Sequence, residues 1–87
     1  MKRISVQKAQ AFSFLKNNKR RWITSEDLAK NSNIASVTAR HYLLEFTKAG
    51  ICKCQKLSPS YLYKMDRDSI DGELFESLEK AITVLNL

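Results

Sequence analysis

The sequence predicts a small α+β domain, mainly helical, built from four helices and one β-hairpin. A helical pattern covers residues 36–49 and is closed by Gly50. Strand-like residues follow at once, at 51–57 and 61–65, on either side of Pro59, which cannot donate a ladder hydrogen bond and therefore marks the turn. With 87 residues, the chain is long enough for one domain with one modest hydrophobic core.

The first helix is expected to begin after Ser5, whose hydroxyl can cap backbone N–H groups, and to run to about Asn18. Its apolar residues recur at helical spacing and form one face, consisting of Ile4, Ala11, Phe12 and Leu15. After a polar, basic break, Trp22 and Ile23 indicate a short strand. The first 23 residues are thus expected to contribute one helix and one short strand.

The second and third helices are predicted from their ends as well as from their apolar spacing. Thr24, followed three residues later by Asp27, fits a capping box at the start of a short helix over about 25–31. Asn33 tolerates the left-handed conformation that a sharp turn needs. In the third helix, one buried stripe is expected from Ala39, Leu43 and Phe46.

A last helix is predicted from about residue 70 or 71 to Asn86. Its apolar stripe consists of Leu74, Leu78, Ile82 and Leu85. Because the spacing is close to a heptad, we expect this stripe to pair with its twin in a homodimer. The alternative is that the stripe folds back on the core of its own chain. The predicted organisation is a domain over residues 1–66 and a C-terminal dimerisation helix over residues 67–87.

Charge is distributed unevenly along the chain. Residues 1–65 hold 13 Lys or Arg and 3 Asp or Glu, a net charge of +10, whereas residues 66–87 carry a net charge of −4. A basic body favours a polyanionic partner such as nucleic acid, and the acidic end is expected to stay away from it.

Several classes of function are not expected. One histidine, the lack of a Gly-rich phosphate loop and the lack of a nucleophile elbow argue against an enzyme, and no cofactor is expected. Cys52 and Cys54 are interpreted as small hydrophobic residues of a strand, with a redox or metal role shared between two copies as the alternative. No apolar stretch reaches 18 residues, and no signal core follows the basic start. We therefore expect a cytoplasmic protein without a membrane partner or small-molecule ligand.

The order of a short helix, a turn, a second helix and a hairpin is typical of a winged helix-turn-helix domain. Within it, residues 22–29, Ile34, residues 38–43 and residues 48–51 resemble bacterial or phage winged-helix regulators. The run Ala39-Arg40-His41-Tyr42-Leu43-Leu44, followed by a glycine and a hairpin, is similar to the small PapI/FaeA-type regulators of fimbrial operons. His41 stands where that family has an aromatic residue, and the resemblance covers only about residues 6–65.

This resemblance implies sequence-directed binding to double-stranded DNA by a small transcriptional regulator, with the third helix in the major groove. The exposed first half of that helix carries Ser36, Val37, Arg40 and His41. Thr38 is a candidate for a phosphate contact, with a hydrogen bond within its own helix as the alternative. Arg40 is the candidate for a guanine contact, because its planar guanidinium can donate to O6 and N7 together. The hairpin over residues 51–65 is expected to follow the backbone or minor groove through Lys53, Lys56 and Lys64. Further phosphate contacts are expected from Lys19, Arg20, Arg21, Thr24 and Ser25.

Two other functions fit the same pattern. The fold also serves in DNA-architecture, recombination or replication accessory factors of the excisionase kind, which are expected to bend DNA at clustered sites. It also serves as a protein–protein interaction module, which is expected to show no salt-sensitive DNA binding.

Overall fold

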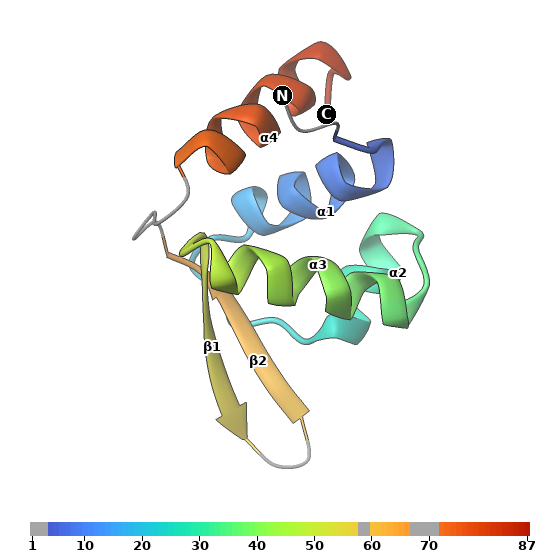
Figure 1. Ribbon diagram of the computed structural model, residues 1–87. Coiled ribbons are helices and arrows are strands. Elements are labelled where there is room, and N and C mark those ends of the chain that lie inside the picture. Colours follow the sequence, from blue (N-terminus) through green and yellow to red (C-terminus); the bar gives the residue numbers. More distant parts are fainter. Residues whose placement is uncertain (1–3, 58–59, 67–71) are drawn as a thin grey trace.

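The computed structural model describes residues 4–57, 60–66 and 72–87 and confirms a mainly helical α+β fold (Figure 1). The helices are α1 (Val6–Asn17), α2 (Ser25–Ser32), α3 (Ser36–Lys48) and α4 (Gly72–Val84). The strands β1 (Cys52–Leu57) and β2 (Ser60–Met65) form an antiparallel hairpin, called the wing below. The expected turn residue Pro59 and the expected first residues of the last helix, 70–71, lie outside the described residues.

Where the sequence indicated a short strand at Trp22 and Ile23, the structure has a single bridge residue, Ile23, beside the two-stranded wing. Ile23 pairs with Tyr63 of β2 in an antiparallel bridge. The Ile23 N–H donates to the Tyr63 carbonyl at 2.8 Å, and the Tyr63 N–H donates to the Ile23 carbonyl at 2.7 Å. This bridge joins the segment before α2 to the wing, so the wing is held from two sides.

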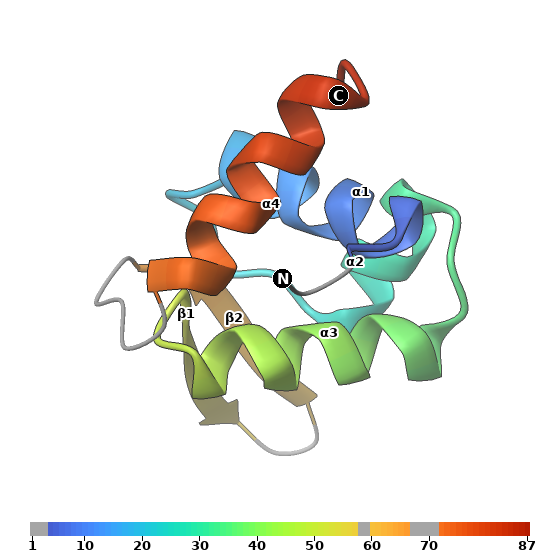
Figure 2. The same ribbon diagram turned by 45° about the horizontal axis from the view of Figure 1, so that its top comes forward.

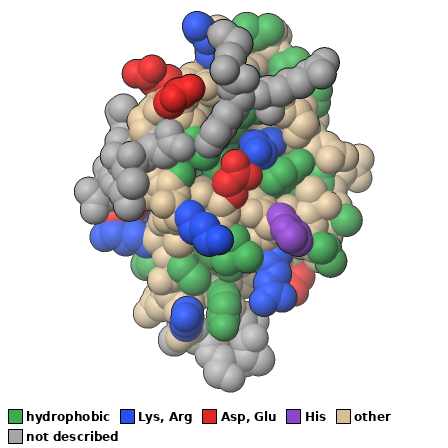
Figure 3. Space-filling view, in the orientation of Figure 1, with side chains coloured by type: hydrophobic (Ala, Val, Ile, Leu, Met, Phe, Trp, Pro, Cys, Tyr) green, Lys and Arg blue, Asp and Glu red, His purple; other side chains and the backbone are tan. Residues whose placement is uncertain are grey.

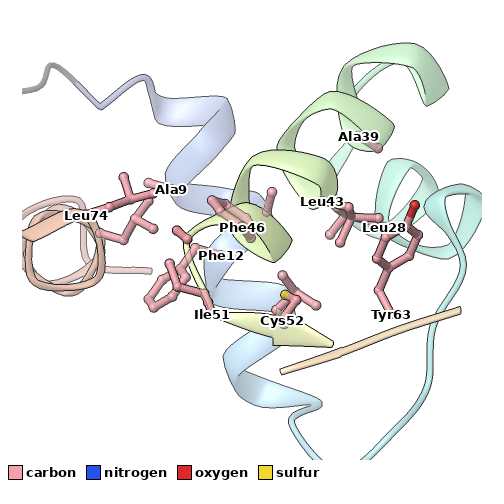
Figure 4. Close-up of a cluster of buried hydrophobic side chains, with 14 of the residues drawn as sticks. Ala9, Phe12, Leu28, Ala39, Leu43, Phe46, Ile51, Cys52, Tyr63 and Leu74 are labelled. Carbon is pink, nitrogen blue, oxygen red and sulfur yellow. The ribbon is translucent and has the colours of Figure 1, made fainter. Parts of the chain in front are cut away.

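The core lies where α1, α3, the base of the wing and α4 meet (Figure 4). Phe12 of α1 is fully buried at its centre, and its ring meets those of Phe46 and Phe75 edge-on, at centroid distances of 6.1 and 5.5 Å. Edge-to-face contacts of this kind add to the free energy gained from apolar burial. A single aromatic side chain therefore joins three helices.

The stripe of α4 packs inside its own chain, which corrects the dimer interface expected from the sequence. Helix α4 lies across α1 in both ribbon views (Figures 1 and 2). The exposed fractions of Leu74, Leu78 and Ile82 are 2%, 0% and 9%. These three side chains are therefore covered by the chain's own core, and only Leu85 of the four is exposed. The two predicted units, 1–66 and 67–87, share this core.

Hydrogen bonds and backbone conformations of nearby residues determine where helices α1, α2 and α3 begin or end. The Ser5 hydroxyl accepts the Lys8 N–H at 3.1 Å, as expected for the cap of α1. At the start of α2, Thr24 and Asp27 form the predicted capping box. Asn33 ends α2 in the left-handed conformation, with φ 54°, and Gly50 follows α3 with φ 78°.

Helix α4 ends two residues earlier than the sequence indicated, because Asn86 also adopts a left-handed conformation, with φ 59°. The Asn86 N–H donates to the Thr83 carbonyl and the Leu87 N–H to the Ile82 carbonyl. These two bonds make the paired closure of a Schellman motif. Asn86 thus terminates the helix instead of extending it.

The capping box of α2 predicts a measurable loss of stability on mutation. Thr24→Ala is expected to lower the free energy of unfolding by about 1 kcal/mol, because it leaves the Asp27 N–H without its acceptor. Urea unfolding followed by circular dichroism measures this. Lys30→Ala, an exposed change on the same helix, is the control and is expected to have a much smaller effect. Equal losses for the two variants would contradict the role of the cap.

Candidate nucleic-acid interface

Helix α3 presents an exposed arc that contains most of the residues expected to read DNA. Ser36, Val37, Arg40 and His41 are exposed, and Leu44 continues the arc by one turn. Thr38 is half-buried, on the flank of the helix that it shares with Tyr42, so the structure places it beside the arc and not within it. The opposite side of α3 buries Ala39, Leu43 and Phe46 in the core, as the sequence predicted.

The beginning of α1 holds α3 in place. The hydroxyls of Ser5 and Tyr42 are hydrogen-bonded at 3.3 Å. Lys8 Nζ lies 2.9 Å from Glu45 Oε1 and 5.7 Å from the centre of the Tyr42 ring. The Lys8 side chain is largely buried, so this ion pair is less screened by solvent than an exposed pair. These contacts fix the orientation of the exposed arc relative to the rest of the domain.

Arg40 lies on the flank of α3 that faces the base of the wing. Burial raises the pKa of Tyr63, the nearby Cys54 side chain raises it further, and the positive charge of Arg40 acts in the opposite direction. The charge of Arg40 therefore acts on a residue of β2. Helix α3 also contacts β1 directly, so the arc of α3 and the wing are adjacent.

The register of the wing separates the three lysines that the sequence grouped together. Lys56 is opposite Tyr61, and Cys54 is opposite Tyr63, so all four share one face of the hairpin. Lys53 is opposite Lys64, on the other face. The face with Lys56 is the one whose base is buried against the core (Figure 4). Only Lys56 thus shares a face with the residues beside α3.

The lysines of the outer face have partners. Lys53 Nζ forms an ion pair with Asp66 Oδ2 at 2.6 Å. Lys64 Nζ lies 5.7 Å from the centre of the Trp22 ring, within the range of a cation–π contact. Both contacts are at the surface and leave the ammonium groups near solvent, but Asp66 reduces the net positive charge around Lys53.

Tyr61 is a candidate contact that the sequence interpretation missed. Its side chain is 41% exposed and lies directly across the hairpin from Lys56. A tyrosine can donate a hydrogen bond to a phosphate while its ring packs on a sugar. The alternation of side chains along 61–65 contained this signal, because Tyr61 is two residues from the buried Tyr63.

Two further groups of residues that were predicted to contact phosphate lie outside the surface formed by α3 and the wing. Lys19 and Arg20 are exposed, but they line a hollow that also contains Asp66 and Glu79. The carboxylates of Asp66 and Glu79 make the hollow less attractive to phosphate. Arg21, the next residue in sequence, is also exposed.

The start of α2 is also less suited to phosphate than expected. The Thr24 hydroxyl accepts the Asp27 N–H, and the Asp27 carboxylate accepts the Thr24 N–H. Glu26 adds a second carboxylate in the first turn, next to the half-buried Ser25. Negative charge at this helix end disfavours an incoming phosphate. The geometry therefore favours α3 and the tip of the wing.

Figure 3 shows how charged side chains are distributed over one face. Lys and Arg side chains occur from the top to the bottom of this face and are most frequent over its lower half, where Figure 1 places α3 and the wing; acidic side chains are visible at the upper left, at the centre and at the lower right. Among the described residues, no helix is long and apolar enough to cross a membrane.

The two cysteines are both free thiols. Cys52 is buried, and burial raises the pKa of its thiol to about 12. The thiolate is the reactive form of cysteine, so burial keeps Cys52 inert at neutral pH. Cys54 is half-buried on the same face. The packing of Cys52 agrees with its interpretation as a small hydrophobic residue.

Comparison with solved structures identifies the fold. The chain is similar to a possible transcriptional regulator from Methanosarcina mazei Go1, with a TM-score of 0.62 and 16% identity over 95% of this chain and 71% of that one. It is also similar to NadR, solved in complex with 4-hydroxyphenylacetate, with a TM-score of 0.61 and 21% identity over 92% of this chain. The match covers 56% of the NadR chain, so the present chain spans little more than half of it. The fold of the chain has the winged-helix layout.

No family model matches this winged-helix domain, and no curated protein matches it significantly. At the identities found, the structural likeness shows the fold alone. The narrower resemblance to PapI/FaeA-type regulators stays a prediction.

Proposed function

We propose that this winged-helix domain binds double-stranded DNA as a small transcriptional regulator, with α3 in the major groove and the tip of the wing on the adjacent backbone. The observation that carries the proposal is the surface formed by the exposed arc of α3, Arg40 on its wing-facing flank, and the wing face with Lys56. An exposed helix beside a basic hairpin matches the shape and charge of a groove and its flanking phosphates.

Each part of this surface has a distinct role in the proposal. Arg40 donates to a guanine edge, and the exposed Val37 packs on a thymine methyl group. The backbone N–H groups of the first turn of α3 are available to a phosphate, because Ala35 at the cap makes no side-chain hydrogen bond to them. Lys56 and Tyr61 contact the sugar–phosphate backbone.

The similar structures support a role in regulation. One is described as a possible transcriptional regulator, and its likeness extends over nearly the whole of the present chain. Helix α4, with its acidic residues, packs on α1 and not on the exposed arc of α3. These observations favour a regulator over a protein–protein interaction module.

A salt series tests the proposal. Affinity for random-sequence duplex DNA is expected to fall steeply with salt, and Lys56→Ala is expected to reduce the slope of log K against log[salt] by about 1. Lys30→Ala removes the same charge from α2, outside the proposed contact surface, and serves as the matched control. Fluorescence anisotropy measures both.

The same binding experiment distinguishes the proposed regulator from the two alternative functions. Lack of binding even at low salt would contradict the DNA proposal and leave the protein–protein interaction module. Binding accompanied by sharp bending at clustered sites would favour an architectural or recombination factor instead. Equal slopes for Lys56→Ala and Lys30→Ala would show that the wing does not contact phosphate as proposed.

A further inference from the structure

A groove runs between the start of the chain's described part and the outer face of α4. Its volume is about 620 Å³, and its apolar lining consists of Ile4, Val6, Ala81, Val84 and Leu85. Val84 is 79% exposed and Val6 is 52% exposed. This face is separate from the buried stripe of α4, and the wing does not contribute to it. Apolar side chains that gather at an exposed groove are typical of an interaction surface.

We propose that a second copy of this chain binds this groove, with the two α4 helices packed antiparallel about a two-fold axis between Glu76 and Ser77. A two-fold interface requires a surface that is complementary to itself. Glu73 and Lys80 supply this complementarity, because they lie seven residues, about two turns, apart on one side of the helix. In the antiparallel pair, Glu73 of each copy is opposite Lys80 of the other.

The charges on this face are available for such pairing. Glu73, Glu76 and Lys80 are exposed, and none of them takes part in an ion pair recorded within the described residues. By contrast, Glu79, on another side of α4, forms an ion pair with Lys16 of α1. The unpaired charges of α4 therefore coincide with the apolar groove.

Small residues allow the two helices to approach closely. In this register Ser77 lies next to the axis, and Ala81 follows one turn along the same face of the helix.

This pairing leaves the proposed DNA surface uncovered, and its role in recognition rests on the proposed function. In Figure 1, α4 and the wing lie at opposite ends of the molecule, with α3 between them. Two copies joined at the α4 end therefore keep both proposed DNA surfaces free.

Sedimentation equilibrium with the purified chain tests the pairing without DNA. We expect the wild type to dimerise, and both Lys80→Glu and Glu73→Lys to raise the dimer dissociation constant at least about tenfold. The double variant Glu73→Lys/Lys80→Glu is expected to restore dimerisation, because it exchanges the two charges. Val84→Asp is expected to abolish it. Lys30→Glu makes the same charge change as Lys80→Glu on α2 and is expected to leave the dimer intact.

Three outcomes would overturn the pairing. These are a wild type that stays monomeric at every concentration, a dimer that survives Lys80→Glu and Val84→Asp, and a double variant that is not rescued. Circular dichroism confirms that each exposed substitution leaves the fold intact. Anisotropy with a single half-site duplex separates this proposal from the DNA proposal, because a monomeric Val84→Asp variant is expected to bind it as wild type does. A dimer without any DNA binding would overturn only the proposed function.

Discussion

Replacing Phe12 with alanine is expected to lower the free energy of unfolding by about 3–5 kcal/mol. The side chain is fully buried and contacts the rings of Phe46 and Phe75, so its removal leaves a cavity where α1, α3 and α4 meet. Small domains have a total stability of only about 5–15 kcal/mol. The variant therefore loses a large part of its stability, and urea unfolding followed by circular dichroism measures the loss.

Two further variants give this prediction its controls. Phe12→Leu keeps most of the apolar volume and is expected to cost less than about 1.5 kcal/mol. Phe14→Ala removes the same ring from a half-buried position on α1 and is expected to cost clearly less than Phe12→Ala. If Phe12→Ala and Phe14→Ala destabilised the domain equally, the central position of Phe12 would be contradicted.

Arg40→Ala is expected to weaken binding to a selected operator by about 10–100-fold, in line with the 1–3 kcal/mol of a bidentate arginine–guanine contact. The loss is expected to concentrate at one base pair, because Arg40 is exposed on α3 next to the wing. Selection from random duplexes identifies the operator. Anisotropy on single-base variants then measures discrimination at each position.

A lysine at this position separates base reading from phosphate contact. Arg40→Lys keeps the charge but lacks the planar fork, so we expect near wild-type affinity for random DNA and a loss of discrimination at one base pair. A uniform loss across all sequences for Arg40→Ala, with full recovery in Arg40→Lys, would instead indicate a phosphate contact.

Helix ends and turns were the features of the fold most open to prediction from the sequence. Thr24 and Asp27 act within one turn of each other, and Asn33 and Gly50 act on their own backbone, so no distant residue decides their conformation. The stripe of Ala39, Leu43 and Phe46 was equally evident, because helical spacing alone places these residues on one side. Local chemistry is sufficient for features of this kind.

The partner of an apolar face was harder to predict. The spacing of Leu74, Leu78 and Ile82 shows that α4 buries one side, but it does not say whether a second copy or the same chain covers it. The rings of Phe12 and Phe75 decide this point, through a contact between residues 63 positions apart in sequence. Such a contact has no signature in a single sequence.

The candidate site was predicted in part. The resemblance to winged-helix regulators implied that Arg40 lies on the exposed half of the third helix, and Arg40 is exposed; its contact with DNA stays a prediction. The sequence could have predicted part of the distribution of the wing lysines over the two faces. Lys53 and Lys56 are three residues apart, and an odd separation puts them on opposite faces of a strand. The ion pair of Lys53 with Asp66 required the register of the hairpin.

The contacts between α1 and α3 have a consequence for the thermodynamics of association. Tyr42 and Glu45 are held by Ser5 and Lys8 before any ligand arrives, so the backbone of α3 is already ordered. Binding through the arc of α3 then restricts only side chains, at a cost of about 0.5–1.5 kcal/mol of conformational entropy for each one immobilised. The domain therefore meets its ligand as a preorganised surface, and little of its affinity is lost to folding on contact.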